Sequence, residues 1–178
     1  MAITKLSNTP SNQNVLQPNK FVLNFSRLPN VQFFCQTLSL PGISTGEIMI
    51  NTPFVDRYSP GEKIVYEPLS VTFLVDEDMK SWLEIHDWIR AMTFPENFDE
   101  YKKMPNLSRV SLVAPSPQFS DATLTIYSSA YTPTYRFKFF DVFPSSLSGI
   151  VFDTQQGPDN TITADVMLRY TYYNLEKL

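Results

Sequence analysis

The chain has few residues that could carry acid–base or metal chemistry. His86 is its single histidine, so sites built from several histidines are excluded. A serine or cysteine nucleophile would have one possible imidazole base. His86 lies at helical spacing from Trp82 and Ile89, which favours a packed or partly exposed side chain over a reactive one. We therefore predict no catalytic residues.

Carboxylates gather at residues 76–78, with Glu84 and Asp87 nearby, and could be imagined as a cation site or a glycosidase pair. A calcium-binding loop arranges its oxygen ligands around a glycine turn, and this run contains no glycine. Carboxylates at the start of a helix instead stabilise the positive end of its dipole. The glycines elsewhere are isolated and form no phosphate cradle. We expect a helix cap, and no metal or cofactor.

Cys35 is the only cysteine, so the chain cannot form an internal disulfide. It follows two phenylalanines, a setting typical of a small buried apolar side chain. We predict an inert core thiol.

Aromatic side chains are the remaining candidates for ligand binding, because tyrosines can stack on sugars or on bases. Stacking on nucleic acid normally comes with many basic residues, and only Arg136, Lys138 and Arg169 lie near the C-terminal tyrosines. A net charge of -4 also disfavours binding to phosphate backbones. Packing in a core or a subunit interface is favoured. A monomeric carbohydrate-binding β-sandwich module that uses Trp82, Trp88 or the tyrosines stays open as an alternative.

The elements that position these residues follow from composition and pattern. A chain of 178 residues with 43% apolar residues suits one domain, 1–178. It has no apolar run long enough to span a bilayer, and its start lacks the apolar run of a secretory signal. Strict alternation predicts strands, the first two of them joined as a hairpin; their ranges are 20–28, 31–38, 69–75, 122–128, 135–143, 146–153 and 162–174, with a short strand at 109–113.

One stretch, 78–92, has apolar residues at helical spacing and is predicted to be a helix. Residues 1–19 are polar and contain two prolines, which indicates a flexible N-terminal arm. Residues 42–66 are predicted to form a projecting arm. The fold class is α+β and mainly β: an antiparallel β-sandwich or curled sheet with one flanking helix.

The order of these parts is similar to that of a known family. Phe33-Phe-Cys-Gln36, the corner Leu40-Pro-Gly-Ile43, the projecting arm, the strand 69–75 and the run from Asp76 to Ile89 resemble the tail tube proteins of contractile-tailed bacteriophages. The likeness is strongest over 20–92 and is supported by the closing strand 162–174.

The resemblance implies a β-sandwich protomer whose strands join those of its neighbours in a hexameric ring, completing an inter-subunit barrel through which DNA passes without specific binding. Rings would stack into a tube inside a contractile sheath. The implied partners are further copies of the chain, the sheath, and baseplate or tail-terminator proteins. The implied location is the virion tail, assembled in the host cytoplasm. A baseplate tube initiator or a tail terminator would share the same fold; we favour the tube proper or the initiator.

Two sets of residues follow as candidate assembly sites. By resemblance, the arm reaches an adjacent ring, with Phe54, Asp56, Tyr58 and Lys63 as its contact residues; the competing interpretation is an exposed hairpin. On the last strand one face is predicted to be buried: Ala164, Val166, Leu168, Tyr170 and Tyr172. The other face includes Met167 and is predicted to line a lumen through Thr163, Asp165, Arg169 and Thr171. A lumen without many cations would let a polyanion pass.

Overall fold

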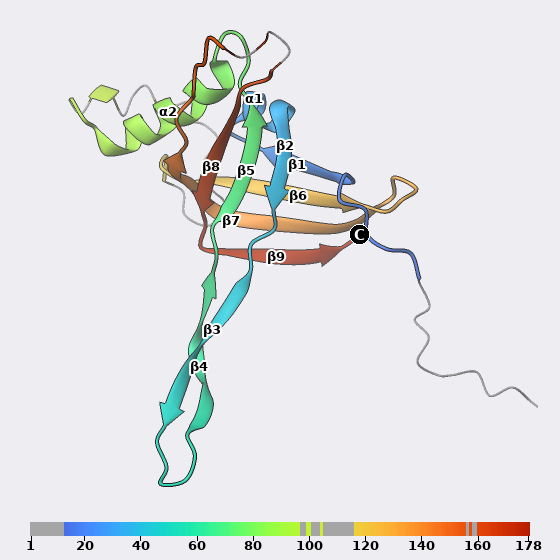
Figure 1. Ribbon diagram of the computed structural model, residues 1–178, viewed down its shortest axis with the longest axis vertical. Helices are drawn as coiled ribbons and strands as arrows, with labels where there is room; N and C mark the ends of the chain where they lie inside the picture. The colour runs from blue at the N-terminus through green and yellow to red at the C-terminus, as the bar shows by residue number, and fades with distance from the viewer. Residues whose placement is uncertain (1–12, 97–98, 101–103, 105–115, 156, 158–159) are drawn as a thin grey trace, which may run out of the picture.

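The computed structural model describes residues 13–96, 99–100, 104, 116–155, 157 and 160–178. Two antiparallel sheet layers cross each other, two helices pack at one end, and a long hairpin projects from the other end (Figure 1). The elements are β1 (Phe21–Phe25), α1 (Pro29–Phe34), β2 (Cys35–Ser39), β3 (Ile43–Ile50), β4 (Arg57–Tyr66), β5 (Leu69–Leu74), α2 (Lys80–Thr93), β6 (Ser120–Tyr127), β7 (Pro133–Leu147), β8 (Thr163–Arg169) and β9 (Tyr172–Lys177).

Strand β7 belongs to both layers. Its first part pairs with β6 and β9, and its last part, 143–147, pairs with β8. Between the two parts, Asp141 has a φ of 57° and the register against β6 shifts, so the strand bends there. We call the layer of β1, β6, early β7 and β9 the β6 sheet, and the layer of late β7, β8, β5 and β2 the β5 sheet. The bend sets the two layers across one another.

The core fills the space between the two sheets and the helices. Alternate residues of β5 and β8 are fully buried, and α2 adds Ile85 and Trp88 while α1 adds Val31. Phe139 and Leu124 close the core from the β6 sheet. The mainly β, antiparallel architecture expected from the sequence is confirmed.

The predicted hairpin of 20–28 with 31–38 is wrong. The turn signal at Pro29 begins helix α1 instead, because proline fits the first position of a helix, where its missing N–H is not needed. Strand β2 therefore starts only at Cys35. Strand β1 pairs with β6 and β2 pairs with β5, so the two segments lie in different layers.

The predicted break between the strands 135–143 and 146–153 is also wrong, as is the second of these strands. Strand β7 continues through Pro144 to Leu147. Late β7 is the edge of the β5 sheet, and an edge strand tolerates a proline because one side of it has no partner strand.

The predicted strand 162–174 is two strands. The chain leaves the β5 sheet after Arg169 and enters the β6 sheet at Tyr172. The predicted helix 78–92 corresponds to α2, and α1 is a second, unpredicted helix. The predicted strand 109–113 lies outside the described residues, as does most of the predicted N-terminal arm.

Candidate assembly surfaces

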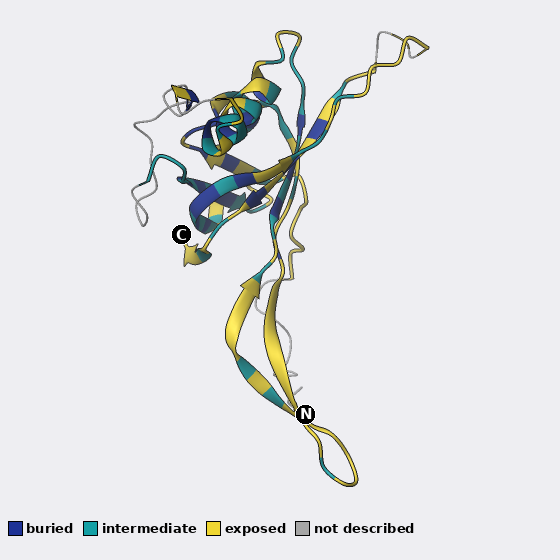
Figure 2. Cartoon of the chain, turned by 90° about the vertical axis from the view of Figure 1, so that its left-hand side faces the viewer, coloured by how far each residue is buried: buried dark blue, intermediate teal, exposed yellow. Residues whose placement is uncertain are grey.

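The β3–β4 hairpin, which we call the arm, stands away from the body and is exposed along most of its length (Figures 1 and 2). Phe54 at its tip is 99% exposed. A lone two-stranded hairpin is marginally stable in water, and soluble monomers rarely display so much apolar surface. The arm therefore suits contact with another molecule. Its exposed large apolar residues are Ile43, Ile48, Met49, Ile50, Phe54, Val55, Tyr58, Ile64 and Val65.

The four arm residues singled out from the sequence, Phe54, Asp56, Tyr58 and Lys63, are all exposed. Phe54 and Asp56 lie in the tip loop, whereas Tyr58 and Lys63 lie on β4. The tip is held by Thr52, whose hydroxyl donates to the carbonyl oxygen of Val55 and accepts from the Val55 N–H at 3.3 Å. The structure thus spreads these residues along the arm and does not gather them into one site.

A bulge bends the arm midway. The register shifts between Thr45 and Glu47, and Gly46 lies beside Gly61. A Cβ atom at Gly61 would come within 2.6 Å of the Gly46 carbonyl oxygen, so this position needs glycine. A Cβ at Gly46 would meet nothing within 4 Å.

The root of the arm is tied to the body by tyrosines. The Tyr66 ring lies 5.7 Å from that of Tyr170 and 5.3 Å from that of Tyr173, between centroids. The Tyr170 hydroxyl donates a 2.9 Å hydrogen bond to the carbonyl oxygen of Glu67. Burial raises the pKa of both Tyr170 and Tyr173. This root was not predicted from the sequence, although the dense tyrosines at 170–173 were a signal for it.

The outward face of the β5 sheet, which we call the polar face, carries mostly hydroxyl side chains. Thr72 on β5 lies between Thr37 on β2 and Asp165 on β8, and its hydroxyl donates to the Asp165 carboxylate at 2.5 Å. A second row runs through Ser39, Ser70, Met167 and Ser146. Asp165 and Arg169 are the only charged residues in β2, β5, β8 and residues 143–147.

The four candidate lumen residues do not all lie on the same strand. Thr163, Asp165 and Arg169 are exposed on β8, opposite the buried residues of that strand. Thr171 is exposed in the connection between β8 and β9, outside both strands.

The predicted buried face is confirmed for Ala164, Val166 and Leu168. Tyr170 packs against the core only partly. Tyr172 does not continue the buried face. Its ring stacks on that of Phe140, with centroids 4.9 Å apart, on one side of the β6 sheet. The next residue, Tyr173, lies on the other side and packs against Phe139. The change of sheet after Arg169 shifts the alternation by one residue.

Both edges of the β5 sheet are open. Strand β2 pairs only with β5, and residues 143–147 pair only with β8 among the described residues. Open edges with unpaired backbone groups recruit strands from other chains unless they are covered.

The carboxylates at 76–78 support the start of α2. The Asp76 carboxylate accepts hydrogen bonds from the backbone N–H groups of Lys80 (3.1 Å) and Ser81 (2.8 Å), and from the Ser81 hydroxyl (2.6 Å). Its burial opposes ionisation, but these hydrogen bonds prevail and lower the pKa of Asp76. Asp78 pairs with Lys80. In the described part of the chain, no three metal-binding side chains come together.

The indoles that a sugar-binding site would need are engaged in packing. Trp88 is fully buried, and its Nε1–H donates to the carbonyl oxygen of Gln118 at 3.2 Å. Trp82 is half-buried, donates to the carbonyl oxygen of Ser148 at 3.2 Å, and stacks on His86 with centroids 5.1 Å apart. His86 therefore packs as predicted. The pair of exposed tryptophans that would favour a carbohydrate-binding module is not found here.

Cys35 is half-buried and packs at the margin of the core, a little more exposed than predicted. Burial raises the pKa of its thiol to about 11, which keeps the sulfur protonated and unreactive at neutral pH. Among the described helices, none combines the length and apolar character needed to cross a membrane.

Comparisons with known proteins agree with this architecture. The chain matches the phage tail tube protein family over residues 3–176. It is 27% identical over 119 residues to the tail tube terminator protein of Enterobacteria phage T4, an alignment that covers 66% of this chain and 61% of that protein. The chain thus spans about three fifths of the length of that relative.

Several solved structures share the fold, among them the following two. The tube-terminating cap of the anti-feeding prophage has a TM-score of 0.64 at 13% identity, covering 99% of this chain and 100% of that one. A chain of the PVC extracellular contractile injection system, from the sheath–tube complex in the extended state, has a TM-score of 0.62 at 13% identity, covering 93% and 94%. With the family match over nearly its whole length, this chain belongs to the phage tail tube protein family.

Proposed function

We propose that the protein is a structural subunit of the tail tube of a contractile tail, and that it works by assembly without catalysis. In this proposal, copies close into a hexameric ring and rings stack into a conduit for DNA ejection. The observation that carries the proposal is the arm, whose apolar side chains are exposed over both strands and are covered by no surface in the part of the chain that the structure describes.

Ring closure is supported by the two open edges of the β5 sheet. Pairing β2 of one copy with residues 143–147 of the next would satisfy both edges and continue the sheet around the ring as an inter-subunit barrel. In such a closed ring the β5 sheet has no remaining edge.

The polar face is the side of that barrel that we assign to the lumen. The inward residues would be Thr163, Asp165 and Arg169, together with the hydroxyl rows of β2 and β5. A surface with one carboxylate and one guanidinium per copy gives DNA no run of cations to bind, so a polyanion can slide. Thr171 lies off the strand and is left out of this surface.

The partners follow from this role: further copies of the chain, a sheath around the tube, and baseplate or terminator proteins at its ends. The location is the virion tail, with assembly in the host cytoplasm. Neither candidate for chemistry is arranged as a catalytic site among the described residues, since Asp76 caps the start of α2 and His86 stacks on Trp82.

A second candidate is the tail tube terminator, a ring that ends the tube. It is favoured by the 27% identity to the T4 terminator protein. The two roles differ in self-assembly: a tube subunit polymerises alone, whereas a terminator forms a single ring that binds the end of an existing tube.

The test is assembly of the purified protein, followed by light scattering across concentration and by negative-stain electron microscopy. The variant Phe54→Ser/Tyr58→Ser removes two exposed apolar side chains from the arm. We expect wild-type tubes, and short or absent tubes for the variant, with unchanged circular dichroism and melting. Loss of folding in the variant would contradict an assembly role for these residues, and single wild-type rings would favour the terminator.

A further inference from the structure

A pocket lies at the end of the molecule opposite the arm. It has a volume of about 550 Å³ and is formed where β5 ends, α2 begins and the β7–β8 connection passes. Its apolar lining residues are Phe34, Leu74, Val75, Met79, Ile150, Phe152 and Ile162. Phe152 is 74% exposed, so the pocket has an apolar wall that the described residues leave uncovered.

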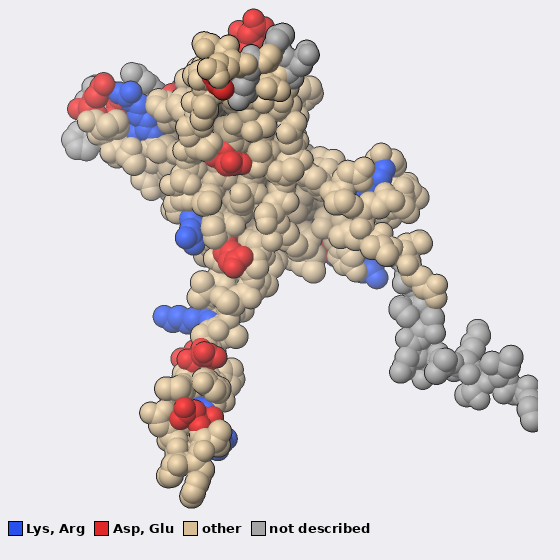
Figure 3. Space-filling model, viewed as in Figure 1, with Lys and Arg blue, Asp and Glu red and all other residues tan. Residues whose placement is uncertain are grey.

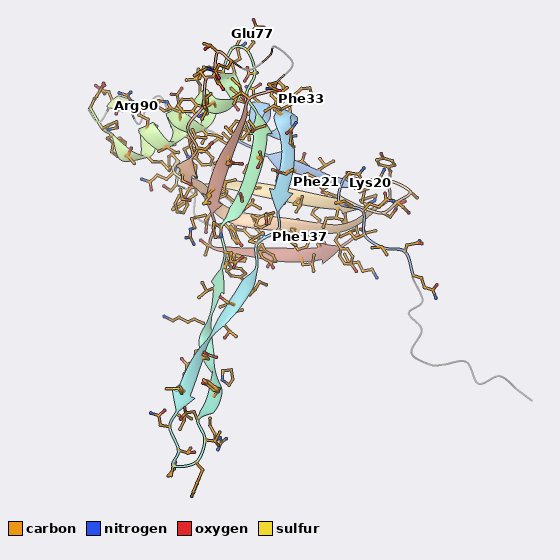
Figure 4. The ribbon with its side chains drawn as sticks, in the orientation of Figure 1. Lys20, Phe21, Phe33, Glu77, Arg90 and Phe137 are labelled. Carbon is orange, nitrogen blue, oxygen red and sulfur yellow. The ribbon has the colours of Figure 1, made fainter. Side chains whose placement is uncertain are left out.

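Strand β5 connects the arm to this pocket. The arm enters β5 at Leu69, and the pocket begins at Leu74 at the other end of the strand. Strand β2 runs the opposite way, from Phe34 at the pocket toward the arm. At about 3.3 Å per residue, β5 separates the root of the arm from the pocket by roughly 20 Å. Figure 4 shows Glu77, which lines the pocket, at the end of the molecule away from the arm.

A stack of rings requires that the arm and the surface that receives it lie at opposite ends of each copy. In head-to-tail stacking, every copy faces the same way, so the surface at one end of a copy meets the surface at the other end of the next. The tip of the arm is apolar and already ordered by Thr52, so little conformational freedom is lost when it docks.

The pocket end carries carboxylates, and the tip of the arm carries one cation beside one carboxylate. The rim of the pocket carries the carboxylates of Asp76 and Glu77, and none of the described Lys or Arg residues lines it. Asp76 is engaged by the start of α2, whereas Glu77 is exposed. The tip carries Asp56 and Arg57, of which Arg57 is the residue that this rim attracts. Figure 3 shows acidic side chains at the end away from the arm and both signs of charge on the arm itself.

We propose that the tip of the arm of one copy docks in this pocket of a second copy in the adjacent ring, with Phe54 against Phe152 and Arg57 beside Glu77. The proposal rests on the proposed function, since it assumes that rings stack. It adds the receiving surface and the charge pair that sets the register between rings.

The test compares tube length, by negative-stain microscopy, among purified full-length variants. Phe152→Ser is expected to leave ring mass and circular dichroism unchanged while tubes shorten to single rings. Glu77→Arg and Arg57→Glu are each expected to shorten tubes, and the double variant Arg57→Glu/Glu77→Arg to restore them.

The matched control is Leu175→Ser. Leu175 is 57% exposed and lines a different apolar groove, between residues 14–17 and the β6 sheet. We expect it to leave tube length unchanged. Three results would overturn the docking without overturning tube formation. They are tubes of wild-type length in Phe152→Ser, shorter tubes in Leu175→Ser alone, and a double charge variant whose tubes are no longer than those of its single variants. A wild-type protein that remains monomeric would overturn the proposed function and the docking together.

Discussion

Tyr170 and Glu67 are joined by a 2.9 Å hydrogen bond from the tyrosine hydroxyl to the glutamate backbone carbonyl. This contact links the end of β8, in the body, to the residue that follows the arm. The Tyr66 ring packs against Tyr170 and Tyr173 at the same place. The direction of the arm is therefore fixed by the fold of the body, as the proposed contact between rings requires.

Removing the hydroxyl in Tyr170→Phe should lower the free energy of unfolding by about 1 kcal/mol, the net value of one hydrogen bond. Urea denaturation measures this loss. Tyr172→Phe is the matched control, because Tyr172 contributes a stacked ring on Phe140. An equal loss of unfolding free energy in both variants would show that the hydrogen bond to Glu67 contributes no stability of its own.

Alkaline pH should also loosen the root of the arm. The pKa values of Tyr170 and Tyr173 are raised from the ordinary value of 10.0 by burial, so the folded protein holds these protons more tightly than the unfolded chain. The stability that they contribute is complete below pH 10 and falls as the pH rises above it. The pH dependence of urea midpoints tests this, and the alkaline loss should be smaller in Tyr170→Phe. A loss of the same size in that variant would contradict the assignment.

Gly61→Ala should disable the arm without unfolding the body. The new Cβ would clash with the backbone of Gly46 at the bulge. Because the arm projects from the body, melting followed by near-ultraviolet circular dichroism should be unchanged, while tubes shorten. Gly46→Ala adds the same methyl group in open space and should assemble normally. Similar tube lengths for the two variants would mean that the bulge is not needed for stacking.

Asp76→Ala should destabilise the start of α2 by about 1 kcal/mol, since it removes an acceptor for two backbone N–H groups. Asp78→Ala removes only an exposed ion pair with Lys80 and should stay within about 0.5 kcal/mol.

The pKa of Asp76 is lowered from 3.8, so its contribution is complete above that pH and is lost as the pH falls through the lower folded value. The stability difference between wild type and Asp76→Ala should shrink in that acid range, and a difference independent of pH would contradict the cap.

Introducing cations on the polar face should make assembled tubes bind DNA. Thr72→Lys/Asp165→Lys replaces a hydrogen-bonded pair with two positive charges per copy. Short single-stranded DNA should then bind tubes with an affinity that falls steeply with salt. The matched substitution Glu176→Lys lies on the β6 sheet, away from this face, and should bind less DNA per tube. Equal binding by both variants would contradict the assignment of the lumen.

The elements that could be predicted from the sequence are those in which the same face stays buried along the whole element. Residues 69–75 alternate because β5 keeps one face in the core along its whole length, and 78–92 has a helical pattern because α2 keeps one stripe buried. The wrong predictions lie where the packing environment of the chain changes within one alternating stretch of sequence. Pro29 serves equally as a turn residue and as the first residue of a helix, and local sequence does not separate these roles.

The places where the chain passes from one sheet to the other could not be predicted from the sequence either. Strand β7 passes between layers at Asp141, and the run after residue 162 divides at Tyr170, yet the apolar pattern continues through both places because both layers face the same core. Among the candidate sites, the exposure of Phe54 and Tyr58 followed from a proline-containing arm. The dense tyrosines at 170–173 indicated a packing site, but their partner at Glu67 could not be predicted, because it lies about a hundred positions away in the sequence.

Cryo-electron microscopy of the assembled wild-type protein, at a resolution that identifies side chains, tests the central claim most directly. The account predicts a hollow six-fold ring in which β2 of each copy pairs with residues 143–147 of the next and Thr163, Asp165 and Arg169 face the channel. A ring whose polar face points outward, or a protein that stays monomeric at high concentration both alone and with preformed tubes, would contradict it.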